Sequence, residues 1–441
     1  MTTSEALSEA EARAVRRVFV RLSVFLFALS IAMSLDRTNI GFAGLQMRKS
    51  LGLNAMQFGF TITIFSVGYI LAEIPSNIMM ARVGARWWLP RITITWGLAS
   101  AAMMFATGAN SLYALRFILG LAEGGFLPGV VLYLSLWLPE YHRARAMSLF
   151  MLAQPVSFVL NPLVSGPLLQ MDGVLDLAGW QWLFLIEGIP SVLMGIYGFY
   201  FLTDLPRNAG WLSAAEKSAL GAAMVRQEPV RADGGQSPRR EYGSWLMLFL
   251  ALTYFGLPVS LATYATWSPQ IVRELVPAGS SFVTVGLVNA IAPAFAVLVM
   301  PWWSARSDRR QERVWHCIVP LALAAMGWMV LALSGNAVVK LAGLTLAICC
   351  AFAAQGIFFT LVAGRLSARA RPVGIAMISA TGLVGAAASP PLTGFFRDLT
   401  GSFSIGLMIA AGMLMVSIGA LLAVWRLGDS LGGRQARSVL P

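Results

Sequence analysis

Apolar stretches of about 20 residues, the length of α-helix that spans a hydrocarbon core of roughly 30 Å, recur along this chain. Only 12% of its 441 residues are charged. Average soluble domains are about 25% charged, so the charged surface that a soluble protein of this length needs is missing. The chain is therefore predicted to be an all-α membrane protein with many transmembrane helices.

About twelve transmembrane spans are expected, six on each side of one long polar segment. They lie near residues 18–38, 57–80, 88–107, 112–138, 146–169, 181–203, 245–268, 282–304, 315–335, 340–363, 373–395 and 403–426. An N-terminal segment (residues 1–17) precedes the first six-helix bundle (18–203). A linker (204–244) leads to the second six-helix bundle (245–426), and a C-terminal tail (427–441) follows. In the linker, Ser213 and Glu216 have the spacing of a capping box that opens a short helix, and the region of Gly234, Gly235 and Pro238 is expected to be flexible.

The net charge of +12 arises mainly from arginines in short gaps between apolar stretches. The positive-inside rule assigns the arginine-rich loops to the cytoplasm. Both termini and the linker are then cytoplasmic too. This distribution explains the charge without a nucleic-acid partner, and none is expected.

The sequence lacks the residues that several classes of function require. Cys317, Cys349 and Cys350 lie in apolar stretches and are expected to be buried small hydrophobes, and no Cys/His spacing suits a metal. No phosphate-binding loop is present, so ATP does not drive the protein directly. The two histidines, His142 and His316, lie at span ends without a nucleophile–base set. No enzymatic activity, metal or cofactor is expected.

Two charged sites interrupt the apolar stretches. Asp36 and Arg37 follow the run from Val18 to Leu35, and Arg116 and Glu123 lie in the run from Leu112 to Leu138. A charge at bilayer depth costs roughly 2.5–3.5 kcal/mol on insertion scales, so ionisable groups there are functional candidates by default. The two pairs indicate a pathway for substrate and protons.

Arg116 and Glu123 are seven residues apart, so both lie on one face of a helix. Gly120, Gly124 and Gly125 beside them allow another helix or a ligand to approach. Burial favours a neutral carboxyl, whereas a nearby arginine favours the ionised one. Glu123 is therefore predicted to bind and release a proton, the alternative being a structural ion pair.

Asp36 and Arg37 are adjacent and point about 100° apart on a helix, so they need partners elsewhere. An arginine fork suits a carboxylate. Arg37 is therefore predicted to receive an anionic substrate and Asp36 to take a proton. The alternative is that both side chains snorkel to water at the outer interface.

Polar side chains in other spans could complete a cavity between the two halves. Tyr69, Gln154, Gln355 and Ser379 are the candidates for substrate contacts. Each could equally make a helix–helix hydrogen bond.

The segment Asp36-Arg37-Thr38-Asn39-Ile40-Gly41-Phe42-Ala43 resembles the first-helix signature of the anion:cation symporter family, within the major facilitator superfamily. The similarity continues in order along the chain. It includes residues 82–86, 91–97, 116–129, 179–188, 267–270 and 307–309, with Arg313, Trp315 and His316.

This resemblance implies the major facilitator fold, two six-helix bundles around a central cavity, in a monomer of the bacterial inner membrane. It implies symport of an organic carboxylate with protons; relatives carry sugar acids, tartrate, phthalate and other aromatic acids. Asp36 and Glu123 match the family's proton-binding acids, Arg37 and Arg116 its anion-handling arginines, and Tyr69 and Gln154 its substrate contacts. Arg82, Arg86, Asp308 and Arg309 match its cytoplasmic gating loops.

The second half departs from the family pattern. Many members have Asn-x-x-Gly-Asn where this chain has Ser379-Ala380-Thr381-Gly382-Leu383, and Phe358-Phe359-Thr360-Leu361-Val362 replaces a Pro-Phe-Trp stretch. A less polar wall favours aromatic or short aliphatic carboxylates over polyhydroxy sugar acids.

The predicted function is import of an organic carboxylate with protons by alternating access. The alternative is a proton-coupled antiporter that exports a drug or metabolite, because such a protein would use similar buried acids. The sequence does not identify the carboxylate or the proton stoichiometry.

Overall fold

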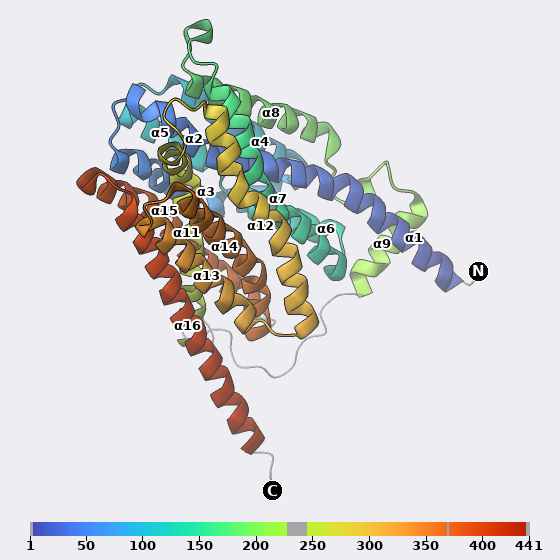
Figure 1. Cartoon of the computed structure of the whole chain (residues 1–441). Helices are drawn as coiled ribbons and strands as arrows, with labels where there is room; N and C mark the ends of the chain where they lie inside the picture. The colour runs from blue at the N-terminus through green and yellow to red at the C-terminus, as the bar shows by residue number, and fades with distance from the viewer. Residues whose placement is uncertain (1–2, 227–244, 368–369, 438–441) are drawn as a thin grey trace. The chain divides into compact units, whose positions relative to one another are not determined.

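The computed structural model describes residues 3–226, 245–367 and 370–437 (Figure 1). Within these ranges the regular structure is helical, without a strand. The helices are α1 (Thr3–Val18), η1 (Phe19–Ser23), α2 (Val24–Ser50), α3 (Ala55–Val83), α4 (Ala85–Ala102), η2 (Met103–Phe105), α5 (Ala109–Glu123), α6 (Phe126–Trp137), α7 (Glu140–Leu169), η3 (Val174–Asp176), α8 (Gly179–Phe201), η4 (Pro206–Asn208), α9 (Ala214–Arg226), α11 (Trp245–Leu275), α12 (Phe282–Arg310), α13 (Val314–Leu333), α14 (Ala337–Arg365), α15 (Arg371–Thr400) and α16 (Ser404–Arg437).

Eleven helical segments in the described ranges are long and apolar enough to cross a membrane. They match eleven of the twelve predicted spans. The third predicted span corresponds to α4 and η2. Arg86 and Arg91 occupy the first two turns of α4, so its apolar part is shorter than in the other spans.

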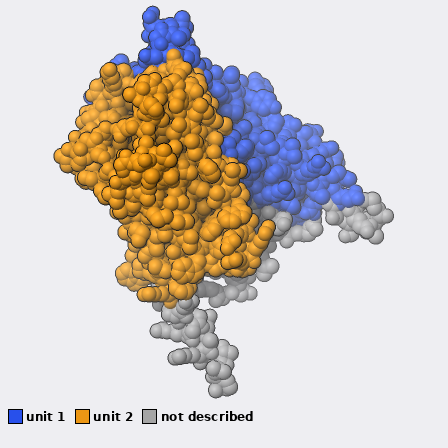
Figure 2. Space-filling view, in the orientation of Figure 1, with its two compact units in different colours: residues 1–39, 64–158, 171–232 blue, residues 40–63, 159–170, 233–441 orange. Residues whose placement is uncertain are grey.

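The chain divides into two compact units (Figure 2). Unit 1 contains residues 1–39, 64–158 and 171–232, and unit 2 contains residues 40–63, 159–170 and 233–441. The boundaries fall inside α2, α3 and α7, so each of these helices contributes residues to both units.

In unit 1 the first span is longer than predicted. The helix already begins at Thr3 and continues through the π-helical turn η1 into α2. Arg17 in α1 forms an ion pair with Glu216 in α9, with 3.0 Å between Nη1 and Oε2. The predicted capping box is confirmed, because Ser213 N donates to Glu216 Oε2 over 2.8 Å and Glu216 N donates to Ser213 Oγ over 3.3 Å. The predicted flexible region around Gly234 lies outside the described residues.

Close helix packing in unit 1 depends on glycine. A Cβ at Gly120 of α5 would collide with the carbonyl oxygen of Phe65 in α3, and a Cβ at Gly188 of α8 would lie 2.7 Å from the carbonyl oxygen of Gly97 in α4. The predicted approach of a helix at Gly120 is thus confirmed. These contacts bring α3 against α5 and α4 against α8, the helices that carry the polar residues described below.

The fourth predicted span is not one continuous helix, which corrects the prediction. α5 ends at Glu123, and α6 begins at Phe126. Between them Gly125 has a φ of 89°, a left-handed conformation that side chains other than glycine's rarely adopt. Interrupted helices at membrane depth are tolerated where the backbone is buried in protein or lines a cavity.

Unit 2 contains α11 to α16 together with the parts of α2, α3 and α7 assigned to it. Gly327 of α13 and Gly343 of α14 pack backbone to backbone, since a Cβ on either would lie within 2.8 Å of the other's carbonyl oxygen. Asp398, near the end of α15, accepts hydrogen bonds from Ala55 N (2.9 Å) and Met56 N (2.8 Å) at the start of α3. Cys317, Cys349 and Cys350 are buried and free, as predicted.

Candidate functional site

Asp36 lies in the middle of α2 and is only 1% exposed. Its carboxylate accepts hydrogen bonds from Ser100 Oγ in α4 over 2.7 Å and from Ser191 Oγ in α8 over 3.1 Å. The prediction that Asp36 finds partners on other helices is therefore confirmed. Its burial contradicts the alternative of snorkelling to water.

Arg37, the next residue of α2, pairs with a different set of side chains. Its Nε donates to Glu123 Oε1 in a short ion pair. Its guanidinium also lies over the Tyr69 ring of α3, 4.8 Å from the ring centroid. The Arg37 side chain is 35% exposed, whereas Glu123 is 1% exposed. Arg37 can therefore contact a ligand while it holds a buried carboxylate.

Arg116 in α5 is 1% exposed and is poorly satisfied. Within the described residues, its Nε and Nη2 have no hydrogen-bond partner. It interacts electrostatically with Asp36 and Glu123, yet the described residues contain no ion pair between Arg116 and Glu123. Glu123 is paired with Arg37 of another helix instead, so the alternative of a structural ion pair that locks spans together stays open.

Asp36, Arg37, Arg116 and Glu123 form what we call the charge cluster. Two acids and two arginines balance when all four are ionised. Buried charges are tolerated only when they are paired and hydrogen-bonded. The free nitrogens of Arg116 therefore leave capacity for an anion or water. Protonation of either acid would leave an excess positive charge in the cluster, which an anion could balance.

Asn39 lies one turn after Asp36 and is fully buried. Neither its amide nitrogen nor its carbonyl oxygen has a hydrogen-bond partner among the described residues. Buried polar atoms without partners are rare in native structures and often mark unseen water or ligand. The helix that carries Asp36 and Arg37 thus also holds a buried amide that could contact water or a ligand.

In unit 2, Gln355 of α14 and Ser379 of α15 are half-buried. Gln355 interacts with Tyr254 of α11, whose ring stacks on Phe358 with centroids 5.1 Å apart. Gly382 makes room for this ring, since a Cβ there would lie 2.5 Å from Tyr254 Cε1. The result is an aromatic wall (Tyr254, Phe358 and Phe359) with one amide beside it.

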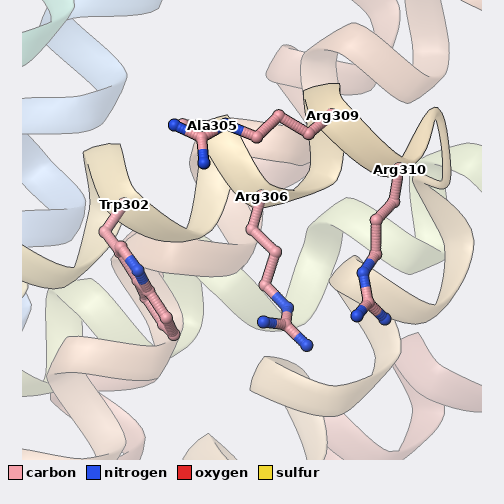
Figure 3. Close-up of a pocket in the computed structure, with 5 residues that line it drawn as sticks. All are labelled: Trp302, Ala305, Arg306, Arg309 and Arg310. Atoms are coloured by element: carbon pink, nitrogen blue, oxygen red, sulfur yellow. The ribbon is translucent and has the colours of Figure 1, made fainter.

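The remaining predicted residues lie elsewhere in their units. Gln154 is half-buried on α7, and Arg82 is exposed near the end of α3. The backbone N–H of Arg86 donates to Asp204 over 2.9 Å, and Asp308 in the last turn of α12 pairs with Arg313, the residue before α13. Arg309 lies on an exposed groove at the end of α12 (Figure 3). Their predicted gating role stays a prediction.

Sequence reasoning missed the partners of Asp36. Ser100 and Ser191 lie in apolar stretches of helices that are distant in sequence, and serines there carry no distinctive signal. It also missed Tyr254, which is far in sequence from the family's divergent positions at residues 358–362 and 379–383. The break in the fourth span was also missed, although the Gly124-Gly125 pair is a sequence signal that could have found it. Within the described residues, no three His, Cys, Asp or Glu side chains could hold a metal ion together.

Comparisons with known proteins agree on one family. Residues 26–390 match the sequence profile of the Major Facilitator Superfamily. A protein of Agrobacterium vitis named "Putative tartrate transporter" is 40% identical over 429 residues, which cover 97% of this chain and 98% of that protein. A Pseudomonas putida protein named "Putative metabolite transport protein NicT" is 39% identical and covers 92% of each chain.

Solved structures show the same fold. A bacterial homologue of the human lysosomal transporter Spinster, in an inward-facing and unoccupied conformation, matches with a TM-score of 0.78 at 15% identity, covering 92% of this chain and 97% of that one. A D-xylose–proton symporter matches with a TM-score of 0.74 at 14% identity, covering 92% and 97%. The predicted all-α membrane fold is thus confirmed.

Proposed function

Because the chain belongs to the Major Facilitator Superfamily, we propose that it imports an organic carboxylate together with protons. That it is a multi-pass membrane transporter, not an enzyme, follows from the family and its relatives. The carboxylate and the proton coupling are our inference. The charge cluster supports both, and the name of the Agrobacterium vitis relative supports an organic acid.

One observation carries this proposal: the partly exposed arginine of the charge cluster is held by a buried acid. Arg37 pairs with Glu123 while a third of its side chain remains accessible. A substrate carboxylate would compete with Glu123 for the same guanidinium fork. Protonation of Glu123 removes that competition. Proton binding and anion binding therefore favour each other through a shared arginine.

The cycle follows from the net charge of the cluster, because protonation of both acids leaves the positive charge of two arginines and a bound anion offsets part or all of it. On the periplasmic side, Glu123 and Asp36 take protons, and Arg37 and Arg116 are free to bind the substrate. Protonated acids with a bound anion expose less net charge to hydrocarbon, so the two six-helix halves, residues 18–203 and 245–426, can change access. On the cytoplasmic side the substrate leaves, the acids release their protons, and Arg37 pairs with Glu123 again.

The substrate class is argued from unit 2. Tyr254 and Phe358 are buried behind Phe359, and the half-buried side chains of Phe359 and Gln355 give the α11–α14 region a mostly apolar surface with one amide. Such a surface suits aromatic or short aliphatic carboxylates. Polyhydroxy sugar acids would leave hydroxyl groups without partners. We expect Ser379→Asn to add sugar-acid uptake; wild-type preference for sugar acids would contradict this assignment.

The decisive experiment is Glu123→Gln in proteoliposomes with radiolabelled tartrate as the probe. The amide keeps the size of the side chain but cannot take a proton. We expect the variant to retain tartrate exchange under equal concentrations on both sides. It should lose accumulation driven by an inward proton gradient. The matched control is Glu274→Gln, an exposed acid of unit 2 that pairs with Arg397.

The outcomes separate the candidate functions. Gradient-driven accumulation by Glu123→Gln at the wild-type level would contradict the coupling role. If an inward proton gradient drives efflux of a loaded compound by the wild type and no tartrate uptake, the protein is an antiporter. Loss of both exchange and accumulation in Glu274→Gln would indicate general damage by acid-to-amide changes.

A further inference from the structure

One face of α12 is exposed along most of the helix. Leu287, Ile291, Phe295, Leu298 and Trp302 recur every three or four residues, so they form a single stripe. Their exposures range from 37% for Ile291 to 72% for Leu298. The opposite face is buried, at residues that include Val285, Gly286, Asn289, Ala290, Ala292, Pro293 and Ala296. In a membrane-spanning helix such an apolar stripe faces lipid.

The stripe changes from apolar to basic side chains after Trp302. From Leu287 to Trp302 it rises by about 22 Å at 1.5 Å per residue, most of a hydrocarbon core of roughly 30 Å. Arg306 and Arg310 follow on the next two turns of the same face. Tryptophan is enriched at the level of lipid headgroups. The basic end of the stripe therefore lies at headgroup depth.

A groove occupies this basic end. Trp302, Ala305, Arg306, Arg309 and Arg310 line a cavity of about 260 Å³. Figure 3 shows Trp302, Arg306 and Arg310 extending in the same direction from successive turns, while Arg309 extends another way. Liquid water occupies about 30 Å³ per molecule, so the groove has room for a phosphate group.

Two arginines of this groove have no acidic partner in the part of the chain that the structure describes. Arg306 and Arg310 are exposed and make no ion pair or side-chain hydrogen bond with any described residue. The adjacent acid, Asp308, is already paired with Arg313. Two exposed guanidinium groups therefore lie where the apolar stripe ends and can bind an anion.

We propose that Arg306 and Arg310 bind the phosphate of an anionic phospholipid. Guanidinium groups bind phosphate oxygens in a bidentate way, and basic pockets at the membrane surface of transmembrane proteins bind anionic headgroups. Trp302 then contacts the glycerol region, and the acyl chains lie along Leu298 and Phe295. A free phosphate would use the arginines but not the apolar stripe, so the continuity of the two selects a lipid.

The test compares two variants that each remove two exposed arginines. Arg306→Gln/Arg310→Gln removes two of the three arginine charges of the groove and keeps Arg309, and Arg16→Gln/Arg207→Gln removes equal charge from exposed positions in unit 1. The full chain is titrated in detergent with phosphatidylglycerol, and bound lipid is counted by native mass spectrometry. Each arginine near an anionic lipid surface contributes about 1 kcal/mol, so we expect about 30-fold weaker binding in the groove variant. The control should bind as the wild type does.

A second measurement locates the lipid. Phosphatidylglycerol with brominated acyl chains should quench part of the tryptophan fluorescence of the wild type, and Trp302→Phe should remove that part. Equal binding by the groove variant and the control would overturn the proposal. Equal retention of phosphatidylcholine and phosphatidylglycerol would also overturn it. Full displacement of phosphatidylglycerol by inorganic phosphate would overturn it too, because it would indicate a site for free anions.

Discussion

Unit 1 buries Asp36, Arg116, Glu123 and Glu187 inside membrane-spanning helices, whereas the described residues of unit 2 bury no aspartate, glutamate, lysine or arginine. Unit 2 buries neutral polar groups instead, such as Ser260, Thr263 and Asn289. Ionised groups within a membrane are costly and persist mainly where function uses them. The difference indicates that charge-dependent steps belong to unit 1, while unit 2 supplies neutral contacts.

The largest effect is expected for Arg37→Ala, which tests whether charge-dependent steps belong to unit 1. The change removes the exposed guanidinium and leaves Glu123 buried without its ion pair, and breaking a buried pair costs about 3–5 kcal/mol. We expect the initial rate of tartrate uptake in proteoliposomes to fall at least about 100-fold. The matched control is Arg273→Ala in unit 2, which likewise removes an arginine that lies over an aromatic ring, that of Phe282. An equal loss there would refute the contrast between the units.

A change in the aromatic wall should affect binding rather than coupling. Gln355→Leu removes the amide beside Tyr254 while keeping a similar volume. A lost hydrogen bond of about 1.5 kcal/mol corresponds to roughly a tenfold rise in KM for the substrate. The ratio of accumulation with and without a proton gradient should stay as in the wild type. A loss of coupling in Gln355→Leu would show that unit 2 takes part in the proton step.

The environment of Asp36 can be probed without removing a charge. Ser100→Ala deletes the donor that lies 2.7 Å from its carboxylate. One hydrogen bond contributes about 1 kcal/mol, so we expect gradient-driven uptake to fall about fivefold. Ser66→Ala, also a buried serine of unit 1, is the comparison. Equal effects of the two variants on uptake would mean that the hydrogen bond from Ser100 to Asp36 contributes no more to transport than Ser66 does.

The smallest effect is expected at an exposed acid of unit 2. Asp398→Ala removes the carboxylate that accepts from Ala55 N and Met56 N. Loss of a helix cap costs about 1 kcal/mol of stability. Thermal unfolding should therefore shift by a few degrees, and tartrate uptake should stay within about twofold of the wild type. A larger fall in uptake would assign Asp398 a role in transport and would contradict the conclusion that charge-dependent steps belong to unit 1.

The sequence predicted most of the fold because length and hydropathy act locally. Eleven of the twelve expected spans have the required length and apolar character. The exception, α4, has arginines in its first turns. The helix break after Glu123 was not predicted from the sequence, because an apolar stretch does not reveal backbone conformation. Only the left-handed Gly125 shows that the fourth span is two helices.

Composition and the positions of Asp36, Arg37, Arg116 and Glu123 determined that this chain is a membrane protein with ionisable groups at depth, since the cost of burying charge holds for any fold. Tertiary structure alone decided which groups meet. It paired Glu123 with Arg37, 86 residues away, rather than with Arg116 on its own helix. The reason is physical: partners of a buried side chain come from whichever helices pack beside it, and glycine contacts between distant helices such as α3 and α5 set that packing.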